Sequence, residues 1–240
     1  MNVRPQNILA EAYGTGAVNR SIETFGLCGA GKTTLLRRLI VAIQETGGEL
    51  LPSIETPVQP QGSNVWAETA RVVSRAFSSE PLGVSRFLFE EANWWLPHKL
   101  GFRIAGMRMR RATTAPLLID SGLLQPFVSF AIEWNLRGSE VPISAFLNAL
   151  ALPDLAIYVR ASPEAAYERY VAREVAAQRA LPRGDLQGRF LMGYEMCQRL
   201  VDLYAHLGLR LEIVDCDEQI ADSVLVHIAQ SVLGHISHMK

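Results

Sequence analysis

The sequence predicts an α/β fold in which a five-stranded parallel sheet carries helices on both faces. Apolar, strand-like runs alternate with segments of helical periodicity along the chain, and successive βα units of this kind build parallel sheets that helices cover. A length of 240 residues suits one domain better than two. A hydrophobic fraction of 49% provides for a large core and excludes an intrinsically disordered chain.

The elements are predicted in the following order. Strands are expected over 21–25, 49–55, 115–120, 155–159 and 209–214. Helices are expected over 32–46, 144–150, 163–180, 190–207 and 220–233. The stretch 59–111 is expected to be mostly helical, with breaks at Pro81 and Pro97. Helical spacing of apolar residues marks the first and the longest of these helices, and glycines end both. Ser162 and Pro163 supply an N-cap and a first-turn proline.

Composition and charge narrow the class of protein. The net charge of −1 gives no reason to expect nucleic acid or a membrane surface as a partner. No apolar run approaches the length of a membrane span, and the start of the chain lacks a signal pattern, so a cytoplasmic protein is expected. Three cysteines without zinc-site spacing fit a reducing compartment.

A phosphate-binding motif dominates the sequence. Residues 26–33, Gly-Leu-Cys-Gly-Ala-Gly-Lys-Thr, match the Walker A pattern G-x-x-x-x-G-K-[ST] between a strand and a helix. The glycines let backbone N–H groups surround a phosphate, so the chain is expected to have the three-layer P-loop NTPase fold. Lys32 should reach the β- and γ-phosphates, and the Thr33 hydroxyl should hold Mg²⁺. The expected nucleotide-binding residues are Gly26, Leu27, Cys28, Gly29, Ala30, Gly31, Lys32, Thr33 and Thr34. A redox role for the Cys28 thiol stays open.

A second motif provides a metal-binding carboxylate. Residues 117–120, Leu-Leu-Ile-Asp, form an apolar strand that ends at Asp120, which is expected to hold Mg²⁺ as a Walker B aspartate. Asp215 has a similar outline, but it is expected to cap a strand. The guanine-reading and transporter-type signatures are absent from the sequence. Ser121, not a glutamate, follows Asp120, which favours phosphoryl transfer to an acceptor over hydrolysis.

Four segments together resemble the nucleoside and nucleotide kinases of the thymidylate kinase-like P-loop group. After the P-loop come Ile-Glu-Thr-Pro at 54–57, Leu-Ile-Asp-Ser-Gly at 118–122, and Pro-Asp-Leu-Ala-Ile-Tyr-Val at 153–159. Arg169 and Arg173 then match the R-x-x-x-R that opens the lid of those kinases. Two departures concern the acceptor: Ser121 replaces the usual arginine, and Thr56 splits the usual E-P pair. The resemblance therefore leaves the acceptor open, and thymidylate is not expected.

The resemblance implies a small-molecule kinase that uses ATP and Mg²⁺. It would transfer the γ-phosphate to a nucleoside, a nucleotide or another metabolite, within one domain spanning 1–240. Residues 58–111 would form a helical acceptor region, and 173–189 would form a lid. Glu55, which ends a predicted strand, would be the general base, with Mg²⁺ binding or strand capping as its alternatives. The expected catalytic residues are Lys32, Glu55, Asp120, Arg169 and Arg173.

Other functions remain open from the sequence. An NTPase that drives a partner would turn over without an acceptor, and a regulatory module would bind nucleotide without turnover. The choice between ATP and GTP is not decided, and the resemblance leaves a homodimer possible.

Overall fold

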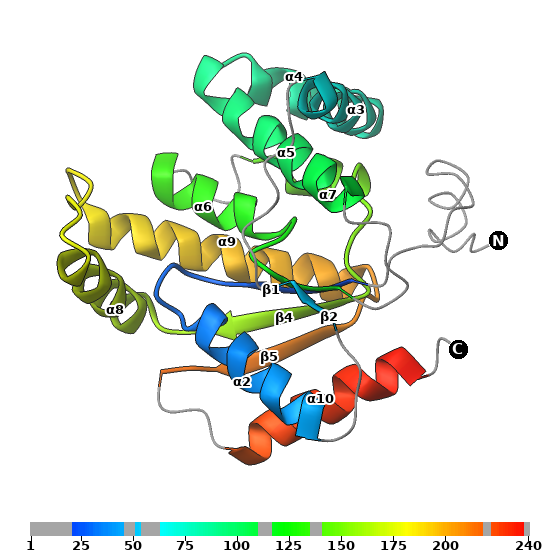
Figure 1. The fold of residues 1–240 in the computed structure, drawn as a ribbon. Coiled ribbons are helices and arrows are strands. Elements are labelled where there is room, and N and C mark those ends of the chain that lie inside the picture. The colour runs from blue at the N-terminus through cyan, green and yellow to red at the C-terminus, as the bar shows by residue number, and fades with distance from the viewer. Residues whose placement is uncertain are drawn as a thin grey trace.

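The structure of the chain is a computed structural model that describes residues 21–45, 51–53, 63–109, 117–134, 141–217 and 222–237. Within these ranges the predicted α/β fold with a parallel sheet is confirmed (Figure 1). The sheet has the order β2-β3-β1-β4-β5, and each pair of neighbouring strands is parallel. Its strands are β1 (Ser21–Phe25), β2 (Leu51–Ser53), β3 (Leu117–Asp120), β4 (Leu155–Arg160) and β5 (Leu211–Asp215).

The strand register brings the functional segments to one edge of the sheet. Thr24 of β1 is paired with Asp120 at the end of β3, and Phe25 is paired with Tyr158 of β4. The glycine-rich loop follows β1 directly, so it lies between the carboxyl ends of β3 and β4. This edge is where ligands bind in open α/β sheets.

Helices cover both faces of the sheet. Figure 1 shows α2 and α10 on one face and α6 and α9 on the other, with α8 beside the carboxyl ends of the strands. These helices are α2 (Lys32–Glu45), α6 (Gln125–Trp134), α8 (Pro163–Ala176), α9 (Leu186–His206) and α10 (Asp222–Ser237). The apolar stripe of α2, which includes Leu35, Leu39 and Ile43, is fully buried against the sheet, as its helical spacing predicts.

A further helical layer lies outside α6. It contains α3 (Ser63–Ser79), α4 (Pro81–Leu88), the 3₁₀ helix η1 (Glu91–Trp94), α5 (Trp95–Met109) and α7 (Ile143–Asn148). The segment expected to be mostly helical over 59–111 is therefore helical over its described residues 63–109, apart from Glu80, Phe89 and Glu90. The expected break at Pro81 is the first residue of α4. The expected break at Pro97 is instead the third residue of α5, within its first turn, where the missing N–H costs no helical hydrogen bond.

Helix α6 was not among the predicted elements. Most of its residues are apolar and buried, and its helical period shows only in the polar residues Gln125, Ser129 and Glu133, spaced four residues apart. Pro126 lies in its first turn, where proline is tolerated, although in the sequence it reads as a break.

Other bounds also differ from the prediction. Helix α8 ends at Ala176, α9 begins four residues before the predicted Phe190, β5 begins at Leu211, and α10 ends at Ser237. Asp185 caps α9 by accepting a hydrogen bond from Gly188 N at 2.9 Å.

Among the described residues, no helix combines the length and the apolar character that crossing a membrane requires.

Candidate phosphate-binding site

The backbone of the P-loop depends on its glycines. Gly29 and Gly31 have φ values of +85° and +97°, a region that residues with a side chain rarely adopt. A Cβ on Gly29 would collide with the carbonyl oxygen of Ala166 and come within 3.0 Å of the Tyr170 nitrogen, both on α8. A Cβ on Gly31 would meet nothing within 4 Å, so this side of the loop faces open space. The loop therefore has one side against α8 and one side open to a ligand.

Lys32 lies folded over this loop. Its Nζ donates to the carbonyl oxygens of Gly26 at 3.1 Å and Leu27 at 2.8 Å. Burial lowers the pKa of Lys32, the negative charge of Asp120 opposes this change, and the positive charge of Arg173 adds to it. The ammonium group is thus within electrostatic reach of both an acidic and a basic side chain of the proposed site.

Thr33 and Asp120 bring oxygen atoms together at the start of α2. The Thr33 hydroxyl donates to Asp120 Oδ2 at 2.5 Å, and Thr24 Oγ1 donates to Asp120 Oδ1 at 3.5 Å. Ser121 Oγ lies 3.1 Å from the same Oδ1, and Ser121 has a left-handed φ of +61°. Hydroxyl and carboxylate oxygens suit Mg²⁺, which protein sites typically bind through one or two carboxylates together with substrate phosphates. The donor set fits the predicted metal.

The other residues predicted to bind nucleotide lie around this loop. Thr34 is exposed at the start of α2, Cys28 is half-buried, and all three cysteines are free. Leu27 and Ala30 are buried in the core below the loop.

The two arginines of α8 do not converge, although their spacing of four residues puts them on one helix face. Arg173 Nη2 and Nε lie 2.9 and 3.0 Å from Glu174 Oε1, and its guanidinium lies 5.3 Å from the Tyr170 ring centroid. Arg169 instead donates to the carbonyl oxygens of Cys216 and Asp217, each at 2.6 Å. Of the two, Arg173 is the arginine whose charge lowers the pKa of Lys32.

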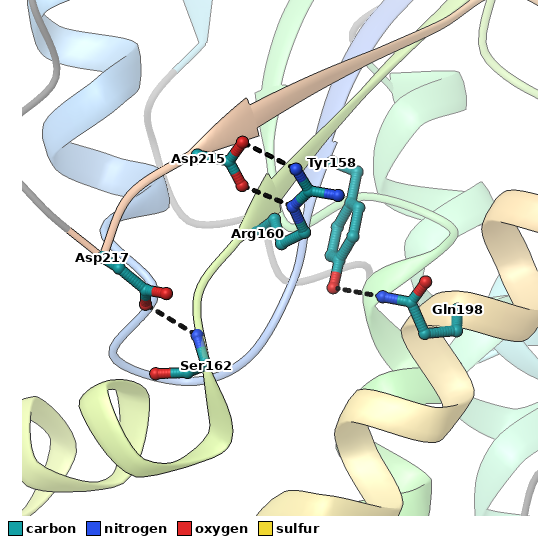
Figure 2. Close-up of polar contacts among 6 residues, drawn as sticks. All are labelled: Tyr158, Arg160, Ser162, Gln198, Asp215 and Asp217. Atoms are coloured by element: carbon teal, nitrogen blue, oxygen red, sulfur yellow. Dashed lines mark hydrogen bonds and ion pairs between the residues drawn. The ribbon is translucent and has the colours of Figure 1, made fainter.

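Asp215, the alternative Walker B aspartate, lies at the other side of the loop from Thr33. Arg160 binds both of its carboxylate oxygens, with Nη2 2.6 Å from Oδ2 (Figure 2). Next to this pair, Gln198 of α9 donates to the Tyr158 hydroxyl at 3.3 Å. The geometry therefore favours Asp120 over Asp215 as the metal-binding carboxylate. Glu55 lies outside the described residues, so its predicted position is not tested.

Glu23 is a buried acid that sequence reasoning missed. Its side chain is 1% exposed on β1, and it accepts a hydrogen bond from Leu124 N at 2.5 Å in the turn that precedes α6. Gln125 in the first turn of α6 accepts a hydrogen bond from Gly26 N at 3.3 Å. Glu23 therefore holds the turn between Asp120 and α6, and Gln125 of α6 in turn binds the first residue of the P-loop. The signal in the sequence was a carboxylate inside the predicted strand 21–25, three residues before the loop begins at Gly26.

The environment of Glu23 changes its protonation. Burial raises the pKa of Glu23 to about 7, and hydrogen bonds from the turn before α6 and the charge of Arg103 on α5 limit this rise. Burial lowers the pKa of Arg103, while the charges of Glu23 and Asp120 oppose this change. Arg103 thus brings a positive charge from the outer helical layer toward the end of β3.

No protein-family model and no curated protein matches the sequence. Solved structures of deoxyadenosine kinase from M. mycoides do match, each at 14% identity. The structure with bound dATP has a TM-score of 0.49 and covers 90% of this chain and 100% of its own. The structures with dCTP and with the products dCMP and dCDP have TM-scores of 0.49 and 0.50, and each covers 89% of this chain and 98% of its own. At this identity the match with a TM-score of 0.50 shows a shared fold alone, and it does not bear out the narrower thymidylate kinase-like group.

Replacing Gly29 by alanine should destabilise the protein and weaken ATP binding. The new methyl group would collide with α8 and would also need a strained φ, which together cost about 3 kcal/mol or more. Urea unfolding and calorimetric ATP titration would measure both effects. Gly208→Ala is the matched control, because Gly208 has a φ of +64° with nothing within 4 Å of its Cβ position. Equal losses in the two variants would contradict the role of the α8 contact.

The Glu23→Gln variant should remove a pH dependence of stability. Because the folded protein binds the Glu23 proton more tightly than the unfolded chain does, the contribution of Glu23 to stability is fully present below about pH 4.5 and is lost as the pH rises through about 7. Between pH 5 and 8 wild type should lose on the order of 2 kcal/mol more than Glu23→Gln in its free energy of unfolding. Urea unfolding at both pH values tests this, with the exposed Glu195→Gln as control. Parallel profiles for wild type and Glu23→Gln would refute it.

Proposed function

We propose that the protein is an ATP- and Mg²⁺-dependent phosphotransferase that moves the γ-phosphate to a small-molecule acceptor, a nucleoside or a nucleotide. One observation carries the proposal. Lys32 and the Thr33–Asp120 pair lie at the P-loop, which has an open side at Gly31, and the charges of Asp120 and of Arg173 on α8 both act on Lys32. Such a set of cations and metal-ligand oxygens is what phosphoryl transfer needs, because its catalysis is mainly positioning and charge neutralisation.

Each of these groups has a proposed role. The backbone N–H groups of 26–34 bind the phosphates together with the N-terminus of α2, and Lys32 leaves its carbonyl partners to contact the β- and γ-phosphates. Thr33 and Asp120 hold Mg²⁺, which would neutralise phosphate charge when bound. Arg173 neutralises charge on the transferred group. Glu174, which is buried, restricts the orientation of Arg173.

The acceptor is proposed to bind between the P-loop and the outer helical layer, within residues 58–111. Glu55 would take the proton from the acceptor hydroxyl. Arg103 lies on α5 within reach of the charge of Asp120, which places a cation on the acceptor side. The nucleoside class of acceptor is proposed by analogy with the matched deoxyadenosine kinase structure that has a TM-score of 0.50. Residues 173–189 are proposed to close over the donor, and a homodimer remains part of the proposal.

ADP release tests the proposed reaction. Wild-type protein with MgATP should release ADP only when one class in a panel of nucleosides, nucleoside monophosphates and sugars is added. Lys32→Ala should lower this rate at least a hundredfold, because one donor to the transferred charge is lost. Release without any acceptor would point to the NTPase function instead. Tight ATP binding with no release in any mixture would point to a regulatory module.

A metal titration distinguishes the two aspartates. Asp120→Asn should raise the Mg²⁺ concentration for half-maximal activity about tenfold and lower kcat about a hundredfold, because a carboxylate ligand is lost. Asp215→Asn should leave the Mg²⁺ requirement unchanged, since Arg160 already binds both oxygens of Asp215. If only Asp215→Asn changes the Mg²⁺ requirement, Asp215 is the metal ligand and our assignment to Asp120 is wrong.

A further inference from the structure

Helix α8 lies between the P-loop and the end of β5. On one side, Ala166 and Tyr170 are the α8 residues whose backbone meets Gly29 of the P-loop. On the other side, Arg169 reaches the backbone at 216–217, directly after β5. Arg169 is three residues from Ala166 and adjacent to Tyr170, so both contacts involve the same two turns of the helix. Any displacement of these two turns would therefore change the packing of α8 against Gly29 of the P-loop.

The contact between Arg169 and the β5 end uses both terminal nitrogens of the guanidinium. Nη1 donates to the Cys216 carbonyl and Nη2 to the Asp217 carbonyl, each at 2.6 Å. Short bonds from a charged donor are stronger than neutral ones, and the planar fork of arginine fits two successive carbonyls. A guanidinium engaged in this way is not directed at a phosphate on the P-loop.

Two more hydrogen bonds join the same segment to α8 and its strand. Figure 2 shows the Asp217 carboxylate accepting a hydrogen bond from the Ser162 nitrogen, at 2.7 Å, immediately before α8. Cys216 N donates to the carbonyl oxygen of Arg160 at 2.8 Å. Ser162 is also the N-cap of α8, accepting from Ala165 N at 3.3 Å. Residues 216–217 are thus connected to the start and to the second turn of α8.

We propose that Arg169 is a positioning residue that ties the end of β5 to α8 and thereby holds α8 against the P-loop. This inference rests on the proposed function only in taking the P-loop as the donor site. Arg169 does not bind the phosphates, and Arg173, one turn further along α8, is the arginine that does. Losing the tie would lower the fraction of molecules whose P-loop is ready to bind, which weakens apparent donor affinity by that fraction. Saturating donor would restore the arrangement, so kcat would be kept.

Four variants test this inference. Arg169→Ala removes the tie, and Arg169→Lys keeps the charge but cannot bridge two carbonyls with the same fork. Arg173→Ala removes the proposed phosphate contact, and Arg37→Ala removes an exposed arginine of α2 as the matched control. Hydrogen exchange without nucleotide is measured at the amides of Cys216 and Ser162, both of which are hydrogen-bonded in this cluster. ATP dissociation constants, KM and kcat are measured on the same proteins.

The expected pattern separates positioning from catalysis. Arg169→Ala and Arg169→Lys should both exchange these two amides at least tenfold faster than wild type and bind ATP about tenfold more weakly, with kcat within twofold. Arg173→Ala should lower kcat about a hundredfold with unchanged exchange at Cys216. Arg37→Ala should match wild type. If Arg169→Ala lowers kcat a hundredfold with unchanged exchange, or if Arg169→Lys retains wild-type affinity, Arg169 acts through its charge and the inference is overturned.

Failure of the proposed function would look different. If wild type transfers phosphate to no acceptor, the kinase proposal fails, while exchange and ATP affinity still decide whether Arg169 ties β5 to α8. If turnover depends on an acceptor but Arg169→Ala leaves exchange and affinity unchanged, the kinase proposal stands and the positioning role is wrong.

Discussion

Gly29 is where the P-loop backbone and α8 approach too closely for any side chain to fit between them. This contact fixes α8 beside the carboxyl ends of the strands, and α8 carries Arg173 toward Lys32 and Arg169 toward the end of β5. The loop itself keeps its other side open at Gly31. A phosphate on that side would therefore face a loop that is supported from behind by a helix, which is how backbone dipoles become preorganised for an anion.

Hydrogen bonds and ion pairs restrain several charged side chains of the proposed site. Glu174, buried on α8, contacts both Arg173 and Arg179, so one carboxylate restrains two cations next to the loop. Asp120 accepts from Thr33 and lies within electrostatic reach of Lys32. Restraint of this kind matters more than the strength of any single pair, because exposed ion pairs contribute little to stability. In the proposed phosphoryl transfer, side chains that are already restrained would need less reorganisation as charge moves between the phosphate oxygens.

The sequence predicted those parts of the fold and site that depend on short segments. The P-loop pattern located its strand, its helix and the Thr33–Asp120 pair, because that geometry is local apart from one strand pairing. Helix α6 was not predicted because its apolar residues are nearly continuous and its helical period shows only in three polar residues, Gln125, Ser129 and Glu133. The sequence did not predict that Arg169 and Arg173 bind different partners. Helical spacing shows which face of the helix a residue lies on, whereas tertiary contacts determine where the end of a long side chain binds.

The turn after β3 shows how a departure from the resembled kinases is accommodated. Ser121 stands where those kinases usually have an arginine, and here it adopts a left-handed φ with its hydroxyl next to Asp120. Behind the turn, a Cβ on Gly122 would come within 2.5 Å of the Glu23 carboxyl carbon, so this backbone is packed directly on a buried acid. An arginine at position 121 would have to adopt the same left-handed φ, because the Gly122–Glu23 contact fixes the backbone of this turn. The positive charge that reaches this edge comes instead from Arg103 on α5, whose pKa responds to both Glu23 and Asp120. The proposed acceptor side is therefore electrostatically coupled to the outer helical layer through Arg103, whereas the proposed donor side is formed by the sheet edge and α8.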